Sequence, residues 1–144
     1  MSFLWDSNIL RHYVDDHPRL FQNLKRVSRD HVLLSIIVVA EQLRGRADTI
    51  LKADSSQLAR AQELFRQTQD LLNQFQILYF DERSLAVAAR LRSQLKTRKR
   101  YADVLIAAQA IAGNHTLITR NTKDFHDLLP PGQLQNWIDN EIHL

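Results

Sequence analysis

The sequence contains no cysteine among its 144 residues. It can therefore form no disulfide bond and no zinc site built on thiolates, so a bound metal ion would need oxygen or imidazole ligands. A set of oxygen ligands points to Mg²⁺ or Mn²⁺ rather than to zinc. The 6 histidines show no pair at the spacing of metal ligands, and we expect most of them to lie at the surface.

Long hydrophobic runs are also absent. The longest one, Val32 to Ala40, is interrupted by Ser35 and is shorter than the roughly 20 residues needed to cross a bilayer. The residues from Met1 to Asp6 lack the basic start and apolar run of a signal peptide. We therefore expect a cytoplasmic protein with no membrane span.

Acidic residues are missing from one stretch, Arg83 to Ala102. The net charge of the chain is only +3, but this stretch collects many of the basic side chains. They are Arg83, Arg90, Arg92, Lys96, Arg98, Lys99 and Arg100. Such a local positive field attracts phosphate backbones, although a solvated basic helix end would have the same composition.

The residues that are present are typical of one compact domain. Apolar residues make up 44% and charged residues 24% of the chain, and no linker, repeat or low-complexity segment divides it. Short apolar runs that suit buried strands alternate with stretches of helical periodicity. We predict an α/β fold, with a central parallel sheet of four to five strands and helices on both faces.

The expected strands are short and mostly apolar. They cover 3–5, 32–34, 77–80 and 115–119, with a last one near Trp137. The expected helices cover 9–14, 18–27, 35–44, 54–75, 85–95 and 102–112. Gly45 and Gly113 are the expected stops of two of these helices, and Leu85 is expected on a buried face.

Acidic side chains follow several of the expected strands. Asp6 lies just past the first strand, Asp103 in the first turn of helix 102–112, and Asp124 shortly after the fourth strand. Ligands of such sheets bind outside the carboxyl ends of the strands, so these side chains should share one rim. An aspartate at a helix start also caps the helix, so each acid taken singly has a purely structural explanation.

Glu41 is a further candidate, although it lies about two turns into helix 35–44. Its side chain reaches the same rim only if that helix leans over it. The apolar run Ile36 to Ala40 precedes it, so we expect a shielded carboxylate, which needs a partner or a metal. Carboxylates gathered from separate strand ends suit Mg²⁺ or Mn²⁺ and a phosphoryl displacement.

Four segments occur in a fixed order: Phe3 to Leu10, Leu34 to Gly45, Ala102 to Ala108 and Thr119 to Phe125. Together they resemble the motifs of the PIN-domain nucleases, especially the VapC-type toxins of bacterial toxin–antitoxin pairs. Each segment alone is loosely defined, but all four with compatible spacing make a strong signal. The resemblance runs through nearly the whole chain and implies that residues 1–144 form a single PIN-like domain.

This resemblance implies a metal-dependent endoribonuclease, the toxin of a type II pair, with a cognate antitoxin and a homodimeric state. It implies that Mg²⁺ or Mn²⁺ is bound by Asp6, Glu41 and Asp103, with Asp124 as a fourth ligand. Three polar side chains are expected to orient the ligands or water, namely Asn8, Thr119 and Asn121. The expected RNA contacts are Lys96, Arg98, Lys99 and Arg100.

Two other functions stay open on sequence alone. Many PIN domains have an aspartate where this chain has Asn121, so the chain could be a catalytically inactive PIN-like module that binds RNA or a partner. An aspartyl-phosphate phosphatase would use Asp6 as its nucleophile, but Asn8 stands where that chemistry needs a second acid.

Overall fold

The structure, a computed structural model, describes residues 1–94 and 100–144. Its centre is a five-stranded sheet in the order β3-β2-β1-β4-β5, in which all neighbouring strands run parallel. The strands are β1 (Phe3–Trp5), β2 (Val32–Ser35), β3 (Gln76–Leu78), β4 (Thr116–Ile118) and β5 (Leu134–Gln135). The predicted α/β fold with a central parallel sheet is confirmed.

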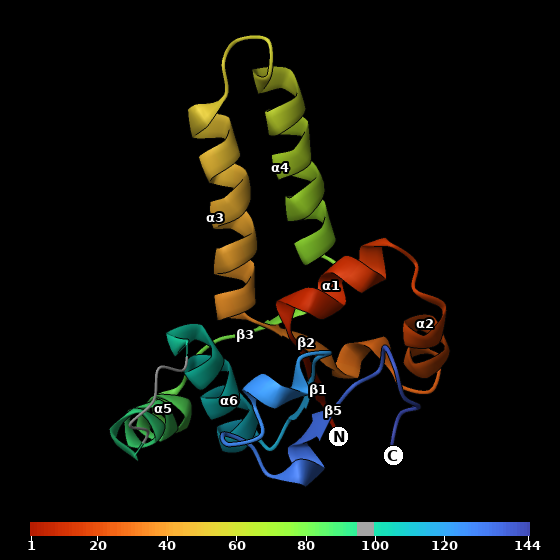
Figure 1. Ribbon diagram of the computed structural model, residues 1–144, viewed down its shortest axis with the longest axis vertical. Coiled ribbons are helices and arrows are strands. Elements are labelled where there is room, and N and C mark those ends of the chain that lie inside the picture. The colour runs from red at the N-terminus through yellow and green to blue at the C-terminus, as the bar shows by residue number, and fades with distance from the viewer. Residues whose placement is uncertain (95–99) are drawn as a thin grey trace.

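The α-helices of the described residues surround this sheet. They are α1 (Ser7–Val14), α2 (Pro18–Leu24), α3 (Ile36–Lys52), α4 (Leu58–Leu72), α5 (Glu82–Gln94) and α6 (Tyr101–Gly113). Figure 1 shows α5 and α6 on one side of the sheet and α1 and α2 on the other. Within the described ranges, no helix has both the length and the apolar character needed to span a bilayer.

The three inner strands form the core. All residues of β1 and β2 are buried, and so are Leu117 and Ile118 of β4, as expected for a parallel sheet covered on both faces. Leu4 and Leu34 are fully buried, and the ring of Trp137 packs against Phe3 with centroids 4.9 Å apart. The last short strand, β5, ends just before Trp137, close to its expected position.

The strand order places a topological switch point at β1, which lies between β2 and β4. The register pairs Trp5 with Ile118, and the N–H of Asp6 donates to the carbonyl of Ile118 at 3.0 Å. The residues that follow β1 and β4, Asp6 and Thr119, are therefore neighbours. Ligands of open α/β sheets bind outside the strands at such a point.

Helix α6 is held firmly against the sheet. Its residues Ala107 and Ala108 are fully buried. The side chain of Gln109 donates to the carbonyl of Leu78 at 2.9 Å and accepts from the hydroxyl of Ser35 at 2.5 Å. These bonds tie α6 to the ends of β2 and β3, and they fix the position of its first turn.

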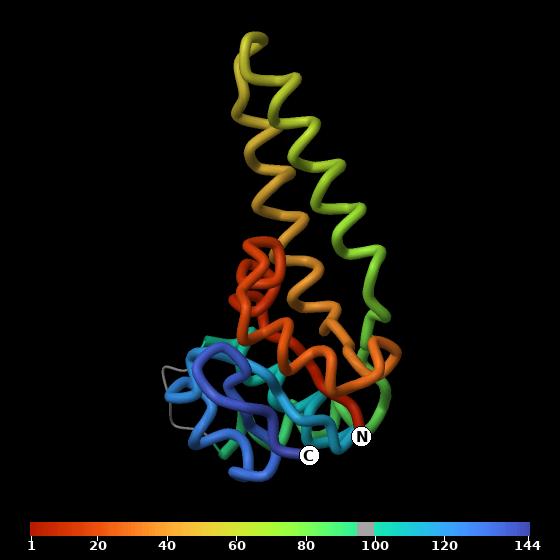
Figure 2. Tube along the Cα trace, turned by 90° about the vertical axis from the view of Figure 1, so that its right-hand side faces the viewer, coloured from red at the N-terminus to blue at the C-terminus, as the bar shows by residue number. Residues whose placement is uncertain are grey.

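Helices α3 and α4 form a hairpin that projects away from the sheet (Figures 1 and 2). We expected the first of these helices to stop at Gly45, and this prediction is wrong, because α3 continues to Lys52. A glycine inside a helix costs only about 1 kcal/mol relative to alanine. The packing of α3 along α4 outweighs that cost.

The helix expected over 54–75 is shorter at both ends, because α4 runs from Leu58 to Leu72. The carboxylate of Asp54 accepts hydrogen bonds from the N–H groups of Ser56 at 2.9 Å and Gln57 at 3.0 Å. This turn delays the start of the helix. The aromatic ring of Phe75 is buried as expected, but it lies beyond the helix.

One further expectation about the helices is wrong. Leu85 is 56% exposed, because Ser84 and Ala88 occupy the inner face of α5. The stop expected at Gly113 is confirmed, since α6 ends at that residue and the next one, Asn114, adopts the left-handed conformation with φ 53°.

Candidate active site

Asp6 lies at the base of the site, directly after β1, and only 7% of the residue is exposed. Its Oδ1 accepts a hydrogen bond from the N–H of Ser7 at 2.8 Å, as a helix cap would. Its Oδ2 accepts from Thr119 Oγ1 at 3.0 Å and from Asn8 Nδ2 at 3.1 Å, which capping does not require. Burial raises the pKa of Asp6, although the hydrogen bonds from Ser7 and Thr119 and the charge of Arg100 act to lower it.

Asn8 and Thr119 also bind each other. Asn8 Nδ2 donates to Thr119 Oγ1 at 3.0 Å. Asn8 Oδ1 accepts from the N–H of Arg120 at 3.0 Å, and Thr119 Oγ1 accepts from the N–H of Asn121 at 3.1 Å. This network joins the first turn of α1 to the segment after β4. It holds one oxygen of Asp6 in a single orientation.

Asp103 lies in the first turn of α6 and is 8% exposed. Burial raises the pKa of Asp103, and the charge of Arg100 lowers it. The negative charges of Asp6, Asp124 and Glu41 raise it further. The four acids that the sequence singled out therefore lie near enough to influence one another electrostatically.

Glu41 is connected to the site through an ion pair with Arg100. Its Oε2 accepts a hydrogen bond from a terminal guanidinium nitrogen of Arg100 at 3.1 Å. The side chain of Glu41 is 28% exposed and that of Arg100 is 68% exposed, so the expected shielding of Glu41 is incomplete. The helix does lean toward the rim, since α3 contacts α6.

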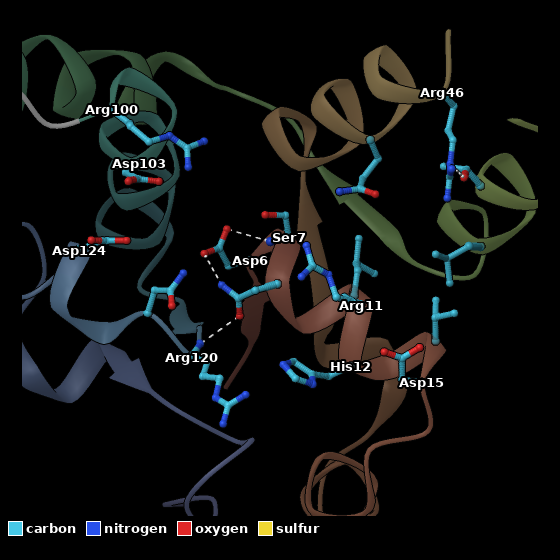
Figure 3. A pocket seen from close by; sticks show the side chains of 17 residues that line it. Asp6, Ser7, Arg11, His12, Asp15, Arg46, Arg100, Asp103, Arg120 and Asp124 are labelled. Carbon is cyan, nitrogen blue, oxygen red and sulfur yellow. Dashed lines mark hydrogen bonds between the residues drawn. The ribbon is translucent and has the colours of Figure 1, made fainter. Parts of the chain in front are cut away.

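The other three acids share one pocket of about 640 Å³. Figure 3 shows the carboxylates of Asp6, Asp103 and Asp124 around the same space. Asn8 and Asn121 also line this pocket, whereas Glu41 does not. Helices α1 and α6, the segment after β4 and the base of the hairpin form its walls.

Three arginines of the pocket wall were missed by the sequence analysis: Arg11, Arg46 and Arg120. Arg46 Nε donates to Thr68 Oγ1 at 3.1 Å, and Arg120 binds the carboxylate of Asp139 through two nitrogens at 3.1 and 3.2 Å. Only Arg120 has a signal in the sequence, since it stands inside the motif that begins at Thr119. The other two lie on separate helices and look like ordinary solvated arginines.

The predicted RNA contacts fall into two groups. Lys96, Arg98 and Lys99 lie outside the described residues. Arg100 lines the pocket, where its guanidinium is engaged with Glu41.

The donor set has the right chemistry for a divalent cation such as Mg²⁺. Asp6 and Asp103 are buried carboxylates, and a nearby positive charge would offset the cost of their burial. A carboxylate has about four lone-pair sites. Asp6 accepts from Ser7, Asn8 and Thr119, and these three bonds leave it room for a cation. Within 1–94 and 100–144, however, no three acid or histidine side chains converge into a ready-made metal cluster. Glu41 must release Arg100 before it can join the other acids.

Comparison with known proteins adds to this geometry. The PIN domain pattern matches residues 3–128. Ribonuclease VapC2 of Rickettsia felis is 28% identical over 142 residues, covering 95% of this chain and 98% of that protein. The crystal structure of VapBC2 from Rickettsia felis, bound to a promoter DNA fragment, matches with TM-score 0.71 at 27% identity, covering 95% and 99% of the two chains. FitAcB from Neisseria gonorrhoeae matches with TM-score 0.71 at 30% identity, covering 96% and 99%. The chain belongs to the PIN domain family.

Proposed function

We propose that this protein is a divalent-metal-dependent endoribonuclease and the toxin of a bacterial type II toxin–antitoxin pair. The observation that carries the proposal is the pair of buried carboxylates, Asp6 and Asp103, which share a pocket with Asp124 at the switch point of the sheet. Carboxylates that repel one another in a buried place weaken a fold, but they suit a site for a cation and a phosphate. The similarity to Ribonuclease VapC2 supports RNA as the substrate.

In this proposal Mg²⁺ or Mn²⁺ is held by Asp6, Glu41 and Asp103, with Asp124 as a fourth ligand. When bound, such a cation lowers the pKa of a water molecule and offsets the charge of the scissile phosphate. The chain itself must keep the ligands in place, and the bonds from Asn8 and Thr119 do this for Asp6.

Arg100 and Asn121 have supporting roles in the same proposal. Once Glu41 turns to the other acids, the guanidinium of Arg100 is free to meet a phosphate of the RNA. Asn121 lines the pocket beside Asp124, where its amide can orient water. Both roles need only side-chain rotations, because the backbone of each residue already borders the pocket.

We also propose that the protein binds a cognate antitoxin and forms a homodimer. A toxin–antitoxin complex from Klebsiella pneumoniae is similar to this chain, with TM-score 0.67 at 26% identity over 98% of this chain, and this supports the antitoxin. Apolar side chains left at the surface support further association. Examples are Leu51 at 81%, Leu58 at 43%, Leu85 at 56% and Tyr101 at 52% exposure.

The test of the activity is cleavage of total RNA by the purified protein with Mg²⁺ or Mn²⁺, with and without EDTA, followed by mapping of the cut ends. Asp103→Asn keeps the size of the side chain and removes one proposed ligand, so cleavage should fall by more than about 100-fold while the protein stays folded. Asp48→Asn is the matched control, because Asp48 is exposed on α3 and does not line the pocket. Full activity of Asp103→Asn would refute the site.

The second candidate is an inactive PIN-like module that binds RNA or a partner. Two observations favour it: Asn121 at a position that is often acidic in the family, and the lack of a ready-made metal cluster in the described part of the chain. Tight binding of RNA without cleavage at any concentration of Mg²⁺ or Mn²⁺ would support this candidate over the nuclease.

A further inference from the structure

The pocket extends well beyond the acids. From Asp6 it passes along α1 to the base of the α3–α4 hairpin, where Arg46 and Thr68 line its far end. Arg11 of α1 lies on the wall between them, as Figure 3 shows. One continuous pocket thus has carboxylates at one end and guanidinium groups along the wall that leads away from them.

Arg46 is held in place at this far end. Its Nε donates to the hydroxyl of Thr68 across the hairpin at 3.1 Å, and Thr68 is only 7% exposed. A guanidinium has five N–H donors, so this bond anchors the group and leaves its two terminal nitrogens available. Within the described residues, neither Arg46 nor Arg11 forms an ion pair with a carboxylate.

A polyanionic substrate needs guanidinium groups near the carboxylates of the pocket. Its scissile phosphate must approach several carboxylates, so the approach is favourable only if the neighbouring phosphates are bound by cations. An anchored guanidinium suits this task, because it offers a planar pair of donors to the oxygens of one phosphate. Val14, which is exposed, and Leu71 also line the pocket, and apolar side chains of this kind suit the faces of unpaired bases.

We propose that Arg46, positioned by Thr68, forms with Arg11 a subsite for the backbone phosphates of single-stranded RNA, a few nucleotides away from the bond that is cut. This inference rests on the proposed ribonuclease function. It directs the RNA across α1 to the hairpin and gives the base of the hairpin a role in substrate binding. The acidic side chain that lines the same region, Asp15, sits at the edge of α1 and limits the subsite on that side.

The test uses fluorescence anisotropy in EDTA, which prevents cleavage, with labelled single-stranded RNA of about three and about ten nucleotides at several salt concentrations. Arg46→Ala should weaken binding of the longer RNA by about tenfold and flatten the plot of log Kd against log salt by about 0.7. The shorter RNA offers fewer phosphates to the two arginines, so both its salt slope and its loss of affinity on Arg46→Ala should be smaller than those of the longer RNA. Arg11→Ala should act in the same direction.

Two variants separate the effect of the charge of Arg46 from the effect of its position. Arg46→Lys keeps the charge but loses the Nε bond to Thr68, so the salt slope should stay while the affinity for the longer RNA falls. Thr68→Val keeps the shape of the hairpin and releases Arg46, and it should give a smaller loss than Arg46→Ala. The matched control is Arg44→Ala, which removes the same charge from the exposed face of α3, outside the pocket.

Equal effects of Arg46→Ala and Arg44→Ala on the longer RNA would overturn the subsite, while cleavage by the wild-type protein would leave the nuclease proposal standing. Wild-type protein that neither binds nor cleaves RNA would overturn both proposals together. A poly-glutamate peptide is the last probe. If Arg46→Ala weakens its binding and leaves that of RNA unchanged, the wall serves an acidic protein segment and the subsite is refuted.

Discussion

The carboxyl group of Asp103 is buried in the first turn of α6, and this has a cost for the metal-free protein. An acid whose pKa in the folded state lies above its unfolded value binds its proton more tightly in the folded state. The contribution of Asp103 to the free energy of unfolding is then fully present below the unfolded pKa of 3.8. It is lost as the pH rises through the raised pKa of the folded state. At neutral pH the charged form of Asp103 therefore weakens the fold.

Asp103→Asn should consequently raise the Tm of the protein in EDTA at neutral pH, by a few degrees, and this gain should shrink toward acid pH. Thermal unfolding at several pH values measures it. Asp48→Asn serves as the control for an exposed acid and should show no such trend. A lower Tm for Asp103→Asn at neutral pH would mean that the carboxylate contributes to folding rather than to a site for a cation.

Arg100 forms an ion pair with Glu41, one of the proposed metal ligands, in the metal-free protein. Arg100→Ala should therefore tighten the binding of Mn²⁺ to the RNA-free protein by roughly tenfold, because a competing cation is removed. Titration calorimetry measures the affinity. The gain should be smaller in a Glu41→Gln background, since the two side chains act as a pair.

Arg120→Ala is the matched control for this experiment. Arg120 lines the same pocket, but its guanidinium is bound to Asp139 and not to one of the proposed ligands. Equal gains in Mn²⁺ affinity from Arg100→Ala and Arg120→Ala would show that any loss of positive charge from the pocket tightens Mn²⁺ binding. The ion pair with Glu41 would then make no separate contribution.

At the level of single residues, the sequence alone could bring Asp6, Asp103 and Asp124 together, because the ends of parallel strands meet at one edge of a sheet. It could not place the pair Arg46 and Thr68. These residues lie on separate helices, and their contact depends on how α3 and α4 pack. No local pattern distinguishes Arg46 from a solvated arginine.

Among the elements, the end of α6 shows what a glycine can do without a special backbone conformation. A Cβ atom at Gly113 would lie 2.2 Å from Nε2 of His115, so the ring of His115 occupies the space of the missing side chain. The ring also forms a hydrogen bond between its Nδ1 and the hydroxyl of Ser2 at 2.5 Å. Burial lowers the pKa of His115, and the charge of the N-terminus lowers it further.

Gly113→Ala should lower the free energy of unfolding by about 1–3 kcal/mol, because the ring must move. A half-buried histidine with a lowered pKa makes the fold less stable as the pH falls below its unfolded value of 6.5. When alanine displaces the ring of His115 into solvent, the loss of stability toward acid pH should be smaller in the variant than in the wild type. Urea unfolding at about pH 7 and about pH 5 measures both effects.

The control for Gly113→Ala is Gly45→Ala. A Cβ atom at Gly45 would meet no atom within 4 Å, and the residue lies inside α3. This variant should raise the stability by about 0.5–1 kcal/mol at both pH values. A stable Gly113→Ala protein with an unchanged pH dependence would contradict the packing of His115 that we describe.

The elements themselves were predicted well where buried periodicity is strong and poorly where packing decides. β1, β2 and β4 lie within one or two residues of their expected bounds, because continuous apolar runs fit a covered parallel sheet. The strand expected over 77–80 is instead Gln76–Leu78, where no residue is buried. Ser35 caps α3 as its position suggested, accepting from the N–H of Ile37 at 3.0 Å. The stop expected at Gly45 failed because contact with α4 extends the helix. The periodicity of apolar residues in the sequence gives no information about the contact between α3 and α4.

For the whole molecule, the hairpin raises the question of association. The helix α4 packs mainly along α3, and the leucines near the tip of the hairpin stay exposed, Leu51 to 81% and Leu58 to 43%. We predict a homodimer at micromolar concentration. Sedimentation equilibrium measures the mass, and a monomer over the whole concentration range would contradict the prediction.

The bond between Asp6 and Thr119 joins residues that are 113 positions apart in the chain. During synthesis on the ribosome, β1 appears first, but its neighbour β4 and the acids of α6 and the segment beyond follow only near the end. An incomplete chain therefore carries Asp6 with its neighbours Ser7 and Asn8, but without the hydroxyl of Thr119 and without the other acids of the pocket. For the proposed nuclease this means that no partly synthesised chain carries the assembled site, because Asp6 and Thr119 meet only when β4 docks beside β1.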